Sequence, residues 1–171
     1  MAGLNPQVIG TTMTAGFAGS YARQPDMIVN TRVAGGSTPI PFGAPLVYND
    51  GAVVQMGASA TAAQFVGVAG REIKSSLQYM EQTPGQYNPG EPVSVFQRGS
   101  IQVYCQRGTP ALGGAVYVRI TANASYESAV VGGFEASADS ANTVQLTNCQ
   151  WGGAPDANGI AELVILTRNN A

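Results

Sequence analysis

The sequence contains no histidine, and this absence removes most of the common catalytic and metal-binding arrangements. Ser-His-Asp and Cys-His nucleophiles, histidine general bases and histidine-containing metal sites all require an imidazole. A zinc site made of cysteine alone needs more cysteines than the two present. The phosphate-binding pattern GxxxxGK[ST] and a helix-opening GxGxxG are also missing. The sequence therefore predicts a protein that is not an enzyme and uses no cofactor and no metal.

Charged residues are also scarce. They make up 11% of the 171 residues, whereas an ordinary soluble domain carries about 25%. A free monomer normally relies on surface charge to stay apart from its neighbours, so low charge favours a surface that other subunits cover. The alternative is a polar, uncharged surface rich in Thr, Ser, Asn and Gln. The eight basic residues are scattered and the net charge is −2, which predicts no binding to nucleic acid.

No apolar run approaches the length of a transmembrane helix, and the first residues lack the basic end and apolar stretch of a signal peptide. We therefore expect no membrane association, and synthesis in a reducing, cytoplasm-like compartment. Cys105 and Cys149 either form a disulfide or are two small buried apolar side chains. The second interpretation is favoured.

What the sequence does contain is a succession of short β-prone runs separated by turn residues. Asn49-Asp50-Gly51 between two such runs predicts a tight hairpin, because both central residues of its turn need positive φ. The nearly continuous apolar run at 160–166 predicts a strand buried on both faces, central or barrel-closing. In the middle of the chain, a helical turn is expected only near 59–64. The pattern predicts an all-β fold of about eight to nine short strands, a β-barrel or barrel-like sandwich.

The first part of the chain has a different character. Up to about residue 37 the apolar residues lie far apart and follow no regular period. We expect residues 1–37 to form an extended N-terminal arm, with one short strand near 27–31, that is either frayed or bound to a partner. Residues 38–171 would form the β-domain, including a Gly-rich, insert-like region near 121–155.

Candidate contact residues come from the arm and from segments expected to be loops. They are large apolar or aromatic side chains, which are enriched at the centres of interfaces: Phe17, Tyr21, Met27, Tyr79, Tyr87 and Trp151. For the last three, the alternative is that the loops fold back and bury them, and the sequence does not decide between the two. Glu72 and Glu162 could form a carboxylate pair of the glycosidase type, but two separate solvated acids are favoured.

The order and spacing of several segments over 39–120 resemble the structural cement, or head-decoration, proteins of tailed bacteriophages. The matching segments are Ile40-Pro41-Phe42-Gly43, the hairpin at Asn49-Asp50-Gly51, Phe65-Val66-Gly67-Val68-Ala69, Tyr87-Asn88-Pro89-Gly90-Glu91-Pro92, Arg98-Gly99-Ser100-Ile101-Gln102-Val103 and Gly114-Ala115-Val116-Tyr117-Val118. The final run Ala161-Glu162-Leu163-Val164-Ile165 is similar too. Residues 121–155 depart from the pattern.

The resemblance implies a subunit on the outer surface of a phage head, made in the bacterial cytoplasm and bound across neighbouring major capsid protein subunits. It also implies a homotrimer, with a dimer or a monomer as alternatives. Two other functions remain open at this point. One is a tail-tube or head–tail connector subunit. The other is a carbohydrate-binding β-domain, which the lack of an aromatic cluster disfavours.

Overall fold

The computed structural model describes residues 15–23, 26–71 and 85–169. Regular structure in these ranges consists of β-strands and short 3-10 turns, so the chain is all-β as predicted. The strands are β1 (Ile28–Val33), β2 (Ile40–Pro41), β3 (Pro45–Asn49), β4 (Ala52–Gln55), β5 (Phe65–Ala69), β6 (Gln86–Tyr87), β7 (Pro92–Arg107), β8 (Ala115–Arg119), β9 (Phe134–Glu135), β10 (Thr143–Trp151) and β11 (Ile160–Ile165). Nine of them form one sheet, and β2 pairs with β6 in a separate short ribbon.

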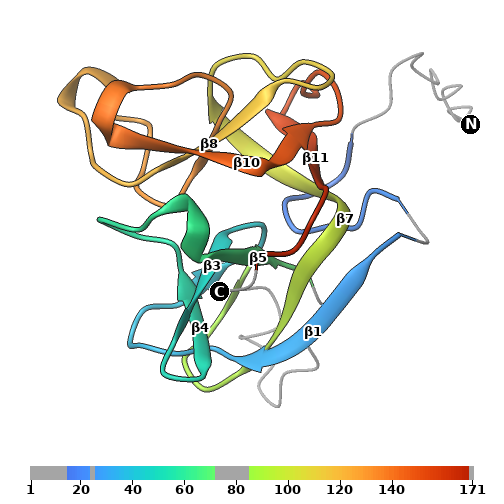
Figure 1. Ribbon diagram of the computed structural model, residues 1–171, viewed down its shortest axis with the longest axis vertical. Coiled ribbons are helices and arrows are strands. Elements are labelled where there is room, and N and C mark those ends of the chain that lie inside the picture. Colours follow the sequence, from blue (N-terminus) through green and yellow to red (C-terminus); the bar gives the residue numbers. More distant parts are fainter. Residues whose placement is uncertain (1–14, 24–25, 72–84, 170–171) are drawn as a thin grey trace, which may run out of the picture.

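The long strand β7 runs through both halves of the molecule (Figure 1). Its first half pairs with β1 and β5, and its second half pairs with β11 and, in parallel, with β9. Gly99, with φ of +98°, lies where the partners change. A Cβ at this position would collide with the carbonyl oxygen of Asp26. Only glycine therefore fits this bend, which lets one strand serve two halves.

In each half the strand pairing returns to its starting point. In one half the order β7-β9-β8-β10-β11 leads back to β7 through the pairing of β11 with β7. In the other half the order β7-β5-β3-β4 continues through an isolated bridge between Val53 and Ala34, the residue after β1. This circular pairing leaves few open strand edges. It confirms the predicted barrel-like architecture.

Two groups of buried side chains form the core. The larger joins both halves, because it contains Phe65 and Phe96 from one and Val116, Trp151 and Leu163 from the other. The smaller lies beside β2 and β6 and includes Ile40, Leu46 and Tyr87. Since the larger core is shared, the two halves are packed as one body rather than as separate domains.

Several local predictions are confirmed. Asp50 and Gly51 both have positive φ, at +48° and +80°, in the hairpin that joins β3 to β4. The predicted central strand is β11, which lies between β7 and β10. The predicted helical turn is a 3-10 turn at Ala62–Gln64. The strand expected in the arm is β1, and it belongs to the main sheet. The division at residue 37 stays a prediction.

Candidate interaction surface

The predicted contact residues of the arm differ in exposure. Phe17 is 66% exposed, and the guanidinium carbon of Arg71 lies 4.2 Å from the centre of its ring. Tyr21 is 36% exposed and packs at 5.4 Å against the ring of Phe96. Met27 is half-buried against the larger core. Of the three arm residues, Phe17 therefore presents the largest free apolar surface.

The expectation that Tyr87 and Trp151 lie in loops is wrong. Tyr87 ends β6 and donates its hydroxyl proton to the carbonyl oxygen of Gly70, and Trp151 ends β10. Both side chains are buried. For these two residues, the alternative prediction of burial within the chain is therefore the correct one. The alternation that precedes Trp151 in β10 was the sequence signal for a longer strand. Tyr79 lies outside the described residues.

Residues 15–23, called the strap below, connect parts of both halves. The backbone N–H of Gly19 donates to the carbonyl oxygen of Gln102 at 2.7 Å, and the N–H of Arg71 donates to the carbonyl oxygen of Gly19 at 2.7 Å. Gln102 belongs to the second half of β7, whereas Arg71 follows β5. The strap is therefore a backbone link between the two halves.

Two carboxylates hold the strap near its ends. The N–H of Ala15 donates to Asp156 Oδ2 at 3.0 Å, and the guanidinium of Arg23 donates to both oxygens of Glu162, at 2.7 and 3.1 Å. The bond from Arg23 holds the pKa of Glu162 below its usual value. Glu162 is thus engaged as an ion-pair partner of the strap, while Glu72, with which it was weighed as a catalytic pair, lies outside the described residues.

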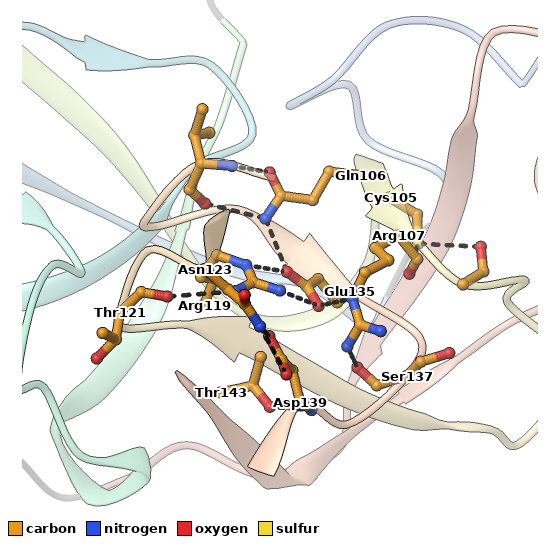
Figure 2. A network of polar contacts seen from close by, with 12 residues as sticks. Cys105, Gln106, Arg107, Arg119, Thr121, Asn123, Glu135, Ser137, Asp139 and Thr143 are labelled. Carbon is orange, nitrogen blue, oxygen red and sulfur yellow. Dashed lines mark hydrogen bonds and ion pairs between the residues drawn. The ribbon is translucent and has the colours of Figure 1, made fainter. Parts of the chain in front are cut away.

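A network of buried charges lies between β7, β8 and the segment that follows β8 (Figure 2). Glu135 of β9 is fully buried. It accepts hydrogen bonds from Arg119 Nε at 2.6 Å, Arg119 Nη2 at 3.2 Å and Arg107 Nε at 2.6 Å. Arg119, also fully buried, reaches Asp139 at 2.9 Å. Two positive and two negative groups therefore balance one another, with Arg119 and Glu135 fully buried and Arg107 and Asp139 partly exposed.

Gln106 extends this network to an exposed residue. Its amide nitrogen donates to Glu135 Oε1 at 3.1 Å and to the carbonyl oxygen of Val130 at 2.9 Å. Its amide oxygen accepts the N–H of Val130 at 2.9 Å. The side chain of Val130 nevertheless stays 62% exposed. The buried charges thus hold in place a residue whose apolar side chain faces solvent.

Val130 forms one lip of an apolar groove of about 190 Å³. The groove lies between the strap, the turn before β3, the outer face of β7 and the segment 128–134, and its lining includes Ala18, Phe42, Tyr104 and Phe134. No lining residue carries a charge. A second hollow, of about 390 Å³, is lined by 35–39, 54–57 and Val131.

Reactive groups are not gathered in the described part of the chain. Among those residues no three His, Cys, Asp or Glu side chains lie close enough to hold a metal ion. Cys105 and Cys149 are both free and buried, as favoured from the sequence, and burial raises the pKa of each thiol. No helix in the described ranges is long and apolar enough to cross a membrane.

The fold and its surface define an all-β, barrel-like protein with an uncharged apolar groove. The profile of a known family, described as structural cement protein (E217 gp24/Pam3 gp6), matches residues 5–166. The chain therefore belongs to the phage structural cement protein family. This confirms the resemblance seen over 39–120 and extends it to nearly the whole chain, including the segment 121–155.

A solved structure shows the same fold. A chain in the capsid of Myoviridae phage XM1 superposes with a TM-score of 0.70 at 17% sequence identity, and the match covers 99% of each chain. No curated protein matches the sequence. Family membership gives the chain a structural, cement-type role in the capsid of a phage virion.

Proposed function

We propose that the protein binds the outer surface of a phage head and bridges neighbouring major capsid protein subunits. In this role it holds the shell together against the pressure of the packaged DNA. The observation that carries the proposal is the family match over residues 5–166. The function requires adhesion between subunits and no bond-making chemistry.

Three physical features support this proposal. The charged fraction of 11% allows much of the surface to be covered at little desolvation cost. Circular strand pairing and a shared core provide a rigid body whose contacts need little ordering on binding. The strap adds a backbone link between the halves, so that a load on one half is passed to the other.

We further propose that the working unit is a homotrimer. Several copies in one unit engage several shell subunits at once, so individually weak contacts add up through avidity. Light scattering of the purified full chain tests this directly. A mass of three chains supports the trimer, and a mass of one or two chains contradicts it.

Imaging of intact particles tests the site of action. If the protein acts there, hundreds of copies lie on the outside of the head, across the boundaries between shell subunits. A single ring of copies at the vertex that carries the tail would assign the protein to the connector. A column of copies below the head would assign it to the tail tube.

A further inference from the structure

We infer that residues 122–131, called the lid below, cover the charge network and open as a unit while the rest of the fold stays intact. The charge network, made up of Arg107, Arg119, Glu135 and Asp139, holds the lid closed. This inference goes beyond the proposed function and does not depend on it.

The lid is not part of the sheet. Inside it, the N–H of Tyr126 donates to the carbonyl oxygen of Asn123, and the N–H of Ala129 donates to that of Tyr126. In the described ranges, the only backbone–backbone hydrogen bond that leaves the lid joins the N–H of Gly133 to the carbonyl oxygen of Val130. The backbone of the lid is therefore held by local turns rather than by strand pairing.

The residues on both sides of the lid are fixed to the sheet. The N–H of Thr121 donates to the carbonyl oxygen of Asn142 at 3.1 Å, and the N–H of Gly132 donates to that of Arg119 at 2.8 Å. Gly132 has a φ of +80°, and a Cβ there would lie 2.7 Å from the carbonyl oxygen of Met56. The lid thus moves between two fixed ends, as hinged loops do.

Little apolar burial keeps the lid closed. Most of its residues are exposed, and Ala129, at 5% exposure, is its one buried side chain. The larger side chains of Tyr126 and Val130 stay 42% and 62% exposed. Segments with few buried apolar contacts open at a lower free energy than the core of the same protein.

Two lid side chains contact the charge network directly (Figure 2). Asn123 Nδ2 donates to the two oxygens of Asp139, at 3.2 and 3.0 Å. The centre of the Tyr126 ring lies 4.6 Å from the guanidinium carbon of Arg107 and 5.9 Å from that of Arg119. The lid therefore lies over the two guanidinium groups.

Gln106 provides the remaining connection. Its amide bonds both backbone polar groups of Val130 and also Glu135. Among the described residues, no other side-chain hydrogen bond, ion pair or ring contact joins the lid to its surroundings. All such contacts therefore end on the charge network or on the amide bonded to it, so weakening them releases the lid as a whole.

Opening the lid returns water to the charge network and changes both hollows. Arg119 and Glu135 are fully buried while the lid is closed, and keeping charges away from water costs free energy. The hydration regained on opening offsets part of the lost contacts. Val130 lines the groove and Val131 lines the second hollow. The open protein thus presents a different surface to a partner than the closed protein.

The test is cleavage of the full-length protein after the exposed Glu127 by a glutamate-specific protease, with the fragments identified by mass. When opening is fast, the cleavage rate follows the population of the open state. Gln106→Leu removes the bonds to Val130, and Asn123→Ala removes those to Asp139. We expect each to raise the rate about fivefold or more. Gln145→Leu, on an exposed position of β10, is the control and should stay within about twofold of wild type.

Urea and a second control separate local opening from unfolding of the whole chain. Local opening exposes little surface, so cleavage of the wild type should change little with urea below the unfolding transition. Gly99→Ala, which disturbs the bend of β7, should leave the rate of cleavage after Glu127 unchanged. Equal rates for the wild type, Gln106→Leu and Asn123→Ala would overturn the role of the network in closing the lid. A wild-type rate that rises with urea as steeply as global unfolding would show that no separate lid exists.

Discussion

At the scale of single residues, a network of ion pairs joins side chains from β7, β8 and β9. Arg119 and Glu135 are both fully buried, and taking either charge out of water is costly unless a partner compensates it. Here each charge has several partners, including Arg107, Asp139 and the carbonyl oxygen of Thr121. The network thereby fastens the segment after β8 onto β7 and positions Val130.

Replacing Glu135 with Gln removes the carboxylate that two arginines share. Because Arg119 then stays buried beside a neutral amide, we expect the free energy of unfolding to fall by about 3–5 kcal/mol. Urea unfolding followed by Trp151 fluorescence measures this change. The exposed Glu127→Gln is the matched control and should change stability by less than about 0.5 kcal/mol. Equal unfolding midpoints for Glu135→Gln and wild type would contradict this view of the network.

Acid should weaken the same region. Hydrogen bonds from Asn123, together with Arg119, hold the pKa of Asp139 below its usual value, while in the unfolded chain it is about 3.9. The unfolded state therefore takes up protons first as the pH falls, so stability is full above about pH 5 and is lost below about pH 4. Urea midpoints at pH 7, 5 and 3 should show this fall, and Asp139→Asn should show a shallower one. An equally steep fall in Asp139→Asn would exclude Asp139 as a source.

At the scale of elements, β7 determines the arrangement of the two halves. Taken alone, residues 92–97 and 100–105 have the composition and alternation of two short strands, with Arg98-Gly99 between them. The structure has one strand, Pro92–Arg107, that bends at this pair. A glycine with positive φ occurs both in turns and in bulges of a continuous strand, so the local signal does not distinguish them. The deciding contacts come from β1 and β11, which are distant in sequence.

Adding a methyl group at Gly99 should disturb this bend. Gly99→Ala forces a residue with a side chain into positive φ, which costs about 1–2 kcal/mol, and its Cβ would collide with Asp26. We therefore expect a loss of at least this size in urea unfolding. Gly153→Ala is the control, because nothing lies within 4 Å of a Cβ there. If both variants unfold at the same urea concentration, the bend does not require glycine.

Local chemistry made some elements predictable. The β3–β4 hairpin depends on two neighbouring residues with positive φ, Asp50 and Gly51, and it was therefore readable from the sequence. The charge network was not readable, because Arg107, Arg119 and Glu135 lie on three different strands that only the sheet brings together. The apolar groove was missed for the same reason, since its walls come from four separate segments. Among the contact candidates predicted from the sequence, the exposed Phe17 directly precedes Ala18, which lines the groove.

At the scale of the whole molecule, the design is a rigid, weakly charged body with a formed groove. Circular pairing in both halves, a shared core and the strap all restrict internal movement. Such a body suits a cement protein, because a soft subunit would yield under load where a stiff one transmits it. Membership of the structural cement protein family accords with this architecture.

The most direct test of the central claim is the temperature at which heads release their DNA. Heads filled in the absence of the protein are heated, with and without added purified full-length protein, and DNA release is followed with a dye that cannot enter intact heads. If the protein cements the shell, heads without it release DNA at a lower temperature, and adding the protein restores the value of complete virions. Release at the same temperature in all three samples would contradict the account.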